Sequence, residues 1–584
     1  MRRVRPLYIP PIRSERPESG TLILRDGTTA AIRPAEPIDA AMMQEFVDRL
    51  SPEARRHRFF SESAPSGDFL TAFCNSRKPY TQFTLVVTRM WKGALRIIAA
   101  GSYWAKSEHT AEVAMAVDDE FHGRGLGTLL LERLALVAIR HDFTRLWAVT
   151  HVDNIAMREV FRESGFSAHE AYEGEDMEVA LSLIPTEFTV TRAELRERLA
   201  TTASLRPFFY PQSVAVIGAS GDSQSIGYRL LEALTSNHFR GAVYPVNPRA
   251  TEIAGIRAYP AIQSVPKPVE LAVIAVPLEK VLSIVDECAS AGVRALVVIT
   301  SGFAEVGPEG KARQMQLVEK VRQHGMRMVG PNCFGLLNTD PNVRLNATFT
   351  SLFPLSGHVA MSSQSGAIGL ATLAATRHVH LGISSFVSIG NKADVSTNDL
   401  LQYWEEDPAT ETILLYMESF GNPRRFARIA RRVSARKPIV AVKAGRTESG
   451  RRAAGSHTAA LATSDVAVDA LFDQTGVIRA ETLDELLAVG LGFATQSLPS
   501  GRRVGIITNA GGPAILCADR CEASGLIVPE LSAQTRKALG AFLPTNAARA
   551  NPVDLIASAT PDQYADAITV MLAADEIDAL IILY

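Results

Sequence analysis

The sequence predicts a multidomain α/β protein, and three observations lead to that fold class. The chain has 584 residues, more than one hydrophobic core usually organises. Between Glu112 and Leu130 a strand-like stretch, a glycine-rich turn and a helix start follow one another. From about Arg206 onwards, short apolar strands, loops and helices alternate, which is typical of parallel sheets covered by helices.

The overall composition is that of an ordinary globular protein. Hydrophobic residues make up 47% and charged residues 21% of the chain. The formal net charge is only -2, so no overall field favours nucleic acid or a membrane surface as a partner. The five cysteines are odd in number and lack CxxC spacing, which argues against a disulfide scaffold and a zinc site; they are Cys74, Cys288, Cys333, Cys517 and Cys521.

No apolar run is long enough to cross a bilayer, and the first residues lack the apolar core of a signal peptide. We therefore expect a cytoplasmic protein with reduced cysteines. Residues 1–19 are rich in arginine and proline and predict a disordered tail, with a basic docking arm as the alternative.

The turn after Glu112 has the composition of a phosphate-binding loop. EVAMAV alternates in a way that suits a half-buried strand, and TLLLERLALVAI has apolar residues at helical spacing. Gly123, Gly125 and Gly127 lie between them and allow a tight turn that aims backbone N–H groups at one point, next to the positive end of the helix. A pyrophosphate suits that geometry. The alternative is a turn that needs glycine only for packing.

A second segment, NIAMREVFRESGF, follows the strand-like RLWAVTHV. Asn154 can cap a short helix there and Gly165 can end it. This order of elements resembles the GNAT family of N-acetyltransferases over about residues 20–183. The resemblance implies a GNAT domain, a mixed sheet with helices, over residues 20–187. The resemblance implies an acetyl-CoA site formed by Val117, His122, Gly123, Arg124, Gly125, Leu126, Gly127, Thr128 and Asn154. His122 replaces the family's usual glutamine, a change we expect to be tolerated because backbone N–H groups supply most phosphate contacts.

Glu112 begins the strand that, by the resemblance, splays to admit the thioester. A carboxylate there can accept the proton of a lysine amine before the amine attacks the acyl carbon; alternatively, Glu112 is a solvated strand residue. AEVAMAV resembles Pat-type bacterial protein-lysine acetyltransferases, in which this glutamate is the general base. Phe161 stands where many GNAT enzymes have a tyrosine that protonates the leaving thiolate. Water or another group would then have to protonate it.

Residues 188–205 predict a charged helical linker, and residues 206–340 a Rossmann-like domain. GASGD departs from GxGxxG, and no acidic residue is placed for a nicotinamide ribose, which argues against a dehydrogenase. VIGAS, YPVNP, AVIAVP, SGFAE and GPNCFG together resemble the CoA-binding domain of NDP-forming acyl-CoA synthetases. The resemblance implies that CoA is contacted by Gly218, Ser220, Gly227, Asn247, Pro277 and Asn332.

Residues 345–500 predict a flavodoxin-like domain of the succinyl-CoA-ligase type. Ser363, Ser365 and Gly366 come at a helix start that can hold a phosphate. GSHTAALA, with His457, resembles the phosphohistidine segment of the NDP-forming synthetases, and Glu418 in LLYMESF matches the carboxylate that orients this histidine. Without those neighbours His457 would be interpreted as an inert loop residue. Ala459 stands where the family usually has glycine.

Residues 501–584 predict a second, incomplete flavodoxin-like domain, with a phosphate loop at Asn509, Gly511 and Gly512. The sequence stops at ALIILY, in what is predicted to be a strand, and nothing in it resembles ATP-grasp. We therefore interpret the chain as truncated. We expect ATP or ADP as a cofactor only if an ATP-grasp partner is present.

Two hypotheses from different enzyme classes use these features. The first is a protein-lysine acetyltransferase whose synthetase-like region binds acetyl-CoA and regulates it, with an AMP-forming acyl-CoA synthetase as the expected protein substrate. The second is an NDP-forming acyl-CoA ligase that uses His457 and Glu418, with an appended GNAT domain. The missing nucleotide module favours the first. A CoA-sensing scaffold is a third, non-enzymatic hypothesis, and the oligomeric state, including a homo-oligomer, stays open.

Overall fold

The computed structural model describes residues 17–447, 449 and 465–584. The chain divides into two compact units, Met1–Ala494 and Thr495–Tyr584, and each is described by itself. Most of the predicted disordered tail lies outside the described residues, and so does His457.

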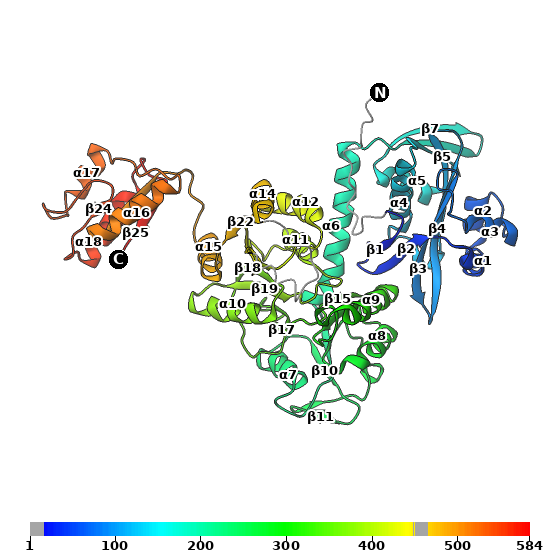
Figure 1. Ribbon diagram of the computed structural model, residues 1–584, viewed down its shortest axis with the longest axis horizontal. Coiled ribbons are helices and arrows are strands. Elements are labelled where there is room, and N and C mark those ends of the chain that lie inside the picture. The colour runs from blue at the N-terminus through cyan, green and yellow to red at the C-terminus, as the bar shows by residue number, and fades with distance from the viewer. Residues whose placement is uncertain (1–16, 448, 450–464) are drawn as a thin grey trace. The chain divides into compact units, whose positions relative to one another are not determined.

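The amino-terminal domain contains an eight-stranded sheet in the order β1-β2-β3-β4-β5-β6-β8-β7 (Figure 1). Neighbouring strands are antiparallel except β5 and β6. The strands are β1 Gly20–Ile23, β2 Thr29–Pro34, β3 Gln82–Trp91, β4 Ala94–Ala105, β5 Thr110–Val117, β6 Arg145–His151, β7 Ser167–Glu173 and β8 Asp176–Ser182. The helices are α1 Ala40–Arg49, α2 Pro52–Phe59, α3 Gly67–Phe73, α4 Leu126–Arg140 and α5 Ile155–Ser164.

Local sequence signals account for the ends of the helix α5. The Asn154 side chain accepts a hydrogen bond from the backbone N–H of Met157 at 3.0 Å, and Gly165 ends the helix in the left-handed conformation with φ 77°. Both ends agree with the predicted cap and stop. Helix α4 presents an apolar face to the sheet, with Leu130, Leu134 and Ala135 fully buried.

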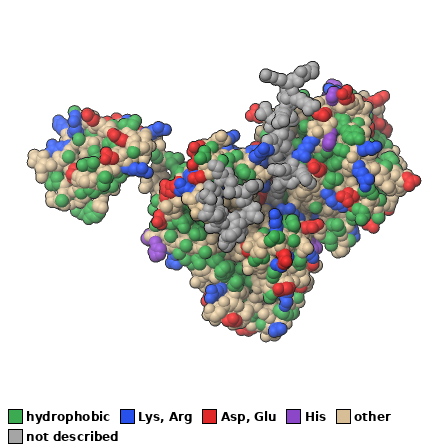
Figure 2. All heavy atoms as spheres, viewed as in Figure 1, with side chains coloured by type: hydrophobic (Ala, Val, Ile, Leu, Met, Phe, Trp, Pro, Cys, Tyr) green, Lys and Arg blue, Asp and Glu red, His purple; other side chains and the backbone are tan. Residues whose placement is uncertain are grey.

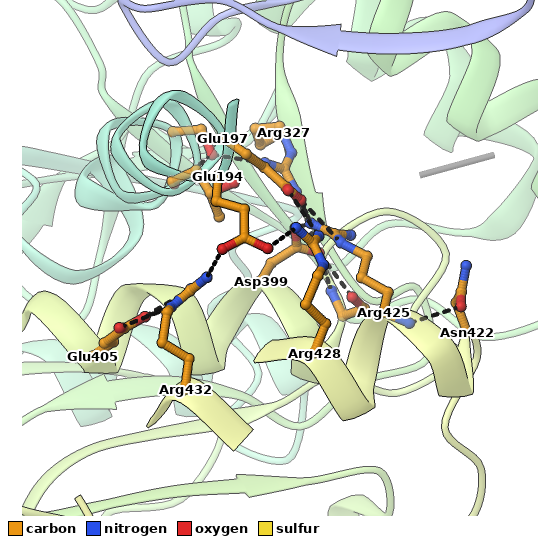
Figure 3. A network of polar contacts seen from close by, with 12 residues as sticks. Glu194, Glu197, Arg327, Asp399, Glu405, Asn422, Arg425, Arg428 and Arg432 are labelled. Atoms are coloured by element: carbon orange, nitrogen blue, oxygen red, sulfur yellow. Dashed lines mark hydrogen bonds and ion pairs between the residues drawn. The ribbon is translucent and has the colours of Figure 1, made fainter. Parts of the chain in front are cut away.

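The helix α6, Glu187–Phe209, covers the predicted linker and extends beyond it at both ends. Toward the amino-terminal domain, Thr189 donates to the carbonyl of Gly165 at 2.9 Å, and Arg196 pairs with Glu132 of α4. On another side α6 presents acidic residues to arginines of α12 (Figure 3). The helix is therefore integrated with both neighbours by tertiary contacts.

The network in Figure 3 is mostly buried and charge-balanced. Arg425 pairs with Glu197 at 2.7 Å, and Arg428 pairs with Glu194 at 2.9 Å. Arg432 pairs with Glu405 at 2.8 Å. Because removing one partner of such a pair leaves an uncompensated charge, these contacts favour one docking geometry between α6 and α12.

Two further sheets complete the first unit, a five-stranded parallel sheet in the order β10-β9-β13-β14-β15 and a seven-stranded sheet in the order β17-β16-β19-β18-β20-β21-β22. Their strands are β9 Ser213–Ile217, β10 Ala242–Val246, β13 Leu271–Ile274, β14 Ala295–Val298, β15 Arg327–Val329, β16 Gly335–Asn338, β17 Leu345–Thr348, β18 Ser356–Ser363, β19 Ile383–Ser388, β20 Thr412–Met417, β21 Ile439–Lys443 and β22 Ile478–Ala480, with β11 Glu252–Ile253 and β12 Ile256–Arg257 forming a small hairpin. The helices are α7 Ile226–Ser236, α8 Val281–Ser290, α9 Pro308–Gln323, α10 Gly366–His378, α11 Thr397–Glu406, α12 Pro423–Ser434, α14 Asp465–Thr475 and α15 Leu483–Thr495.

The second unit has a three-stranded parallel sheet in the order β24-β23-β25. Its elements are β23 Val504–Thr508, α16 Gly511–Ala523, α17 Ala533–Leu539, β24 Val553–Asp554, α18 Pro561–Leu572 and β25 Ala579–Ile582. Ile507, Val553 and Met571 are fully buried and form the centre of its core. The predicted α/β architecture is confirmed in both units.

The surface carries both signs of charge. On the face shown in Figure 2, blue and red side chains are interspersed, in agreement with the net charge of -2. Within the part of the chain that the structure describes, no helix is both long and apolar enough to cross a membrane.

Candidate functional site

The sheet of the amino-terminal domain opens between β5 and β6. The two strands pair in register only from Thr110 to Glu112, opposite Arg145 to Trp147. Beyond that point they separate, and a cavity of about 930 Å³ lies between them, lined by residues 113–117 and 148–150 among others. The predicted splay therefore provides a cleft that reaches into the sheet.

The glycine-rich turn forms one end of this cavity. Gly123 and Gly125 have φ of 73° and 79°, and Gly125 is the N-cap of α4. A Cβ on Gly123 would have no heavy atom within 4 Å, so this glycine faces open space. The backbone N–H groups that begin α4 provide the positive helix end that a pyrophosphate requires.

Most of the predicted acetyl-CoA residues line the same cavity. They are Val117, His122, Gly123, Gly125, Leu126, Gly127, Thr128 and Asn154, together with Glu112. Arg124 differs, because its side chain pairs with Asp26 at 3.2 Å and lies 4.9 Å from the centre of the Phe121 ring. Arg25 lines the cavity and was not identified from the sequence; its backbone N–H donates to the carbonyl of Arg124 at 3.0 Å.

The surrounding structure explains why His122 and Gly127 occur at their positions in the turn. His122 shares a hydrogen bond of 2.9 Å between its Nε2 and the carbonyl of Val117, which closes the turn back onto β5. A Cβ on Gly127 would approach Cγ2 of Val160 to 2.8 Å. A glycine at this position therefore lets α4 and α5 pack closely.

Glu112 lies at the opposite end of β5, where its side chain is exposed toward the cavity. On the neighbouring strand β4, Trp104 is the residue directly opposite Glu112. Arg58, at the end of α2, lines the same end, and the charge of Glu112 acts on it. Phe161 is 2% exposed and belongs to the core, so its side chain has no part in lining the cavity.

In the Rossmann-like domain, three of the predicted CoA residues make close contacts with other residues of the chain in and around the glycine turn. A Cβ on Gly218 would lie 2.2 Å from the carbonyl oxygen of Ala275, and one on Gly227 would lie 2.1 Å from that of Gly218. Asn247 donates to the carbonyl of Ala219 at 2.7 Å and accepts from two backbone N–H groups. Close packing accounts for the two glycines and hydrogen bonds within the turn account for Asn247, and the contact of these residues with CoA stays a prediction.

The other three predicted CoA residues lie on nearby loops. Ser220 accepts a hydrogen bond from the N–H of Asp222 at 3.1 Å, and Pro277 precedes the short 3-10 helix 278–280. Asn332 has φ of 55° and donates to the side chain of Asn391 at 3.3 Å. All three follow carboxyl ends of strands or precede helix starts, where ligands bind in open α/β sheets.

In the flavodoxin-like domain, Ser365 is the N-cap of α10 and accepts from the N–H of Ile368 at 3.3 Å. Ser363 donates to the carbonyl of Ser365 at 2.6 Å, and Gly366 is the first helical residue. The predicted phosphate loop is therefore a capped helix start at the carboxyl end of β18.

A polar cluster that was not predicted joins this loop to Glu418. The Gln364 side chain accepts from the backbone N–H groups of Glu418 and Ser419, at 2.8 and 2.9 Å. Lys392, which follows β19, donates to the carbonyl of Ser419 at 2.8 Å. Burial lowers the pKa of Lys392 to about 8, and the charge of Glu418 opposes this shift.

The cluster thus gathers at the carboxyl ends of β18, β19 and β20. Gln364 and Glu418 directly follow the buried strands β18 and β20, which is a signal visible in the sequence, whereas Lys392 comes four residues after the end of β19. His457, the predicted phosphoryl carrier, lies outside the described residues.

In the second unit, Asn509 follows β23, and Gly511 and Gly512 begin α16. A Cβ on Gly511 would lie 3.5 Å from a carboxylate oxygen of Asp554, and one on Gly512 would have nothing within 4 Å. The loop therefore has the geometry of an accessible helix start. Among the described residues there is no group of three or more His, Cys, Asp and Glu that could hold a metal ion.

Four family models match the chain in order. They are the acetyltransferase (GNAT) family over residues 47–166, a CoA binding domain over 212–339, a succinyl-CoA ligase like flavodoxin domain over 356–492 and a ligase-CoA domain over 504–584.

Relatives and solved structures agree with these matches. The acetate–CoA ligase [ADP-forming] II subunit alpha of Pyrococcus furiosus is 44% identical over 374 residues, which cover 64% of this chain and 81% of that subunit. The acetate–CoA ligase [ADP-forming] of Methanocaldococcus jannaschii is 41% identical over 358 residues, 61% of this chain, and the chain spans only 50% of that protein. A structure of the dinucleotide forming acetyl-coenzyme A synthetase 1 of Ca. Korarchaeum cryptofilum, in complex with phosphate and ADP, matches with a TM-score of 0.63 and 41% identity, over 65% of this chain and 82% of that one.

The chain therefore belongs to the family of NDP-forming acetyl-CoA synthetase alpha subunits, and it carries a GNAT domain in front of the shared region. The predicted fold class and the use of CoA are confirmed. The ranking of the two hypotheses is corrected, because the relatives support the ligase better than the acetyltransferase that the sequence alone favoured.

Proposed function

We propose that the synthetase-like region is the alpha-type component of an ADP-forming acyl-CoA ligase. The observation that carries this proposal is the 44% identity across 81% of a protein named as a ligase subunit alpha. A subunit, by that name, works with at least one other chain. The lack of a nucleotide module in this sequence, which favoured the acetyltransferase, therefore does not count against a ligase.

The proposed chemistry divides a difficult transfer into easier steps. His457 would take the terminal phosphoryl group of ATP, releasing ADP, and pass it to the carboxylate of the acid. The thiol of CoA then attacks the acyl carbon, loses its proton and displaces phosphate. Glu418 would orient the histidine, while Lys392 and the start of α10 supply positive charge beside the phosphoryl group.

The test supplies the full chain with a separately expressed ATP-grasp subunit and measures ADP release that depends on both acetate and CoA. We expect His457→Ala and Glu418→Gln to remove this activity. His378→Ala is the matched control, because that exposed histidine lies at the far end of α10. ADP release that survives His457→Ala would reject the proposed mechanism.

A second candidate function is favoured by the 930 Å³ cavity, which contains both the glycine turn and Glu112. We propose that the GNAT domain is an acetyl-CoA-dependent N-acyltransferase whose acceptor is a protein lysine. The pyrophosphate would lie at the start of α4 and the thioester between β5 and β6. By the resemblance to Pat-type enzymes, an AMP-forming acyl-CoA synthetase is the expected substrate protein.

In this reaction Glu112 accepts a proton from the lysine ammonium, and the neutral amine attacks the acyl carbon. The C–N bond forms, the nitrogen gives up its second proton to water, and the C–S bond breaks so that CoA leaves as a thiolate. Because Phe161 is buried in the core and has no proton to give, water would protonate the thiolate.

Transfer of labelled acetyl to a purified AMP-forming acetyl-CoA synthetase tests this function. We expect Glu112→Gln to lower the rate by roughly 10²–10⁴-fold, the usual contribution of a positioned general base. Glu108→Gln is the control, since Glu108 is an exposed residue of the loop before β5 that does not line the cavity. Equal rates for wild type and Glu112→Gln would contradict the assigned role.

A further inference from the structure

Arg58 is placed in the wall of the GNAT cavity by three aromatic rings. Its guanidinium carbon lies 5.0 Å from the ring centre of Phe59, 5.4 Å from that of Phe73 and 5.9 Å from that of Trp104. These distances suit cation–π contacts, which restrict where the planar guanidinium can lie. The side chain is therefore held in position.

Arg58 lies at the end of the cavity away from the phosphate turn. Trp104, which it contacts, is paired in register with Glu112 at the beginning of β5, whereas the turn follows the end of that strand. Val117 lies five residues beyond Glu112 along the strand, about 17 Å at the usual rise. In the proposed binding mode the phosphates of CoA would lie at the turn and the start of α4, where Arg25 also lines the cavity, so they do not account for Arg58.

The positive charge of Arg58 has no direct partner among the described residues, since none forms an ion pair or a hydrogen bond with its guanidinium. Two neighbouring basic residues of the same helix differ in this respect. Arg56 and His57 both contact the carboxylate of Asp153, at 2.5 and 3.2 Å. Burial lowers the pKa of Arg58 to about 10, with the charge of Glu112 acting in the opposite direction. Arg58 is half-buried, and a partly desolvated cation without a partner gains from a bound anion.

The acceptor end of the cavity thus presents two opposite charges, the carboxylate of Glu112 and the guanidinium of Arg58. An amine alone would satisfy only the first. We propose that Arg58 binds an anionic group of the acceptor, so that the preferred acceptor is an amine with a carboxylate close to it. The amine would face Glu112 while the carboxylate receives the fork of N–H donors from Arg58.

This inference rests on the proposed N-acyltransferase function and narrows its acceptor class. Two sources have the same chemistry, a lysine residue with a neighbouring aspartate or glutamate in a polypeptide, and a free amino acid. The experiment therefore uses matched pairs from each source. The first pair is two peptides that differ by Glu or Gln beside one lysine, and the second is free lysine and lysine amide.

The assay measures release of CoA by the full chain with each acceptor. With wild type, we expect kcat/KM to be about tenfold or more higher for the acidic member of at least one pair, as for a charge-assisted hydrogen bond. Arg58→Met keeps much of the apolar stem and should erase that preference without changing the KM for acetyl-CoA. Arg77→Met is the control, because Arg77 is exposed and lies outside the cavity.

The outcomes separate the inference from the function on which it rests. A preference found only in the peptide pair, or only in the free pair, identifies the source. Equal kcat/KM within both pairs, or a raised KM for acetyl-CoA in Arg58→Met, would overturn the assignment of Arg58. Transfer to no acceptor above the rate of Glu112→Gln would reject the N-acyltransferase function itself.

Discussion

The turns before α4 and α7 look alike in the sequence but differ in what surrounds their glycines. Around Gly123, the position of an added Cβ is open, and the backbone φ of 73° is what favours glycine. Around Gly227, the same position lies 2.1 Å from a carbonyl oxygen of the chain itself. The first glycine leaves room at the cavity, whereas the second lets the helix α7 pack against the strand β9.

This difference shows that a glycine-rich turn after a strand has two separate physical causes. One is a requirement for backbone conformation or open space near a ligand, and the other is close packing of chain against chain. Both cause the same residue to appear at the same kind of position. The two turns therefore predict different consequences for the same substitution, glycine to alanine.

The largest effect is expected for Gly227→Ala. Its Cβ would meet a backbone oxygen that cannot move without shifting the turn, so we expect a loss of about 3 kcal/mol or more in the free energy of unfolding. Gly221→Ala is the control in the same loop, because its Cβ would have nothing within 4 Å. Thermal unfolding of the three proteins measures the difference. Similar unfolding midpoints for Gly227→Ala and wild type would contradict the inference that close packing requires a glycine at this position.

Gly123→Ala is expected to affect binding more than folding. An alanine with positive φ costs about 1–2 kcal/mol, and Gly93→Ala carries the same strain, with φ 83° and open space, in the turn between β3 and β4. We therefore expect the two variants to lose similar stability. Only Gly123→Ala should weaken acetyl-CoA binding, by about tenfold, as measured by calorimetry. Equal affinities would show that the space at Gly123 is not used by the ligand.

Much of the fold was predictable because its signals are local. Asn154 and Gly165 mark the ends of α5 through contacts within a few residues, and both act as expected. The partners of α6 were not predictable, because the pairs of Glu197 with Arg425 and of Glu194 with Arg428 join residues more than 200 positions apart. The charge pattern indicated a helix, but not the surfaces against which it packs.

The candidate sites also contain residues that local sequence predicts and residues that it does not. The turn and Glu112 were found because strand, loop and helix are consecutive in the chain. Arg58 and Lys392 were missed, since each acquires its setting from distant elements, Arg58 from rings on α3 and β4 and Lys392 from the loops after β18 and β20. A lone basic residue in a sequence gives no indication of such surroundings.

The second unit offers a glycine intermediate between the two cases. Gly511 begins α16, and its Cβ would lie 3.5 Å from Asp554, an ordinary contact, without a positive φ. Because alanine restricts the unfolded chain more than glycine does, we expect Gly511→Ala to leave stability unchanged or raise it by about 0.5 kcal/mol. Denaturant unfolding of the full chain, followed with a probe in this unit, tests the change. A clear destabilisation would show that Gly511, like Gly227, is required for close packing of the chain.

The smallest effect is expected at His122, the residue that departs from the GNAT pattern at the phosphate turn. Its ring nitrogen hydrogen-bonds the carbonyl of Val117 at 2.9 Å, and its side chain is exposed. A glutamine amide can donate to the same carbonyl, and the phosphate contacts at a helix start come from backbone N–H groups. We therefore expect His122→Gln to keep the KM for acetyl-CoA within about threefold, equivalent to less than ~1 kcal/mol. His122→Ala removes the hydrogen bond and provides the comparison. A large rise in KM for the glutamine variant, although it keeps the hydrogen bond, would show that the imidazole contacts the ligand, and the turn would then depend on a side chain as well as on its glycines.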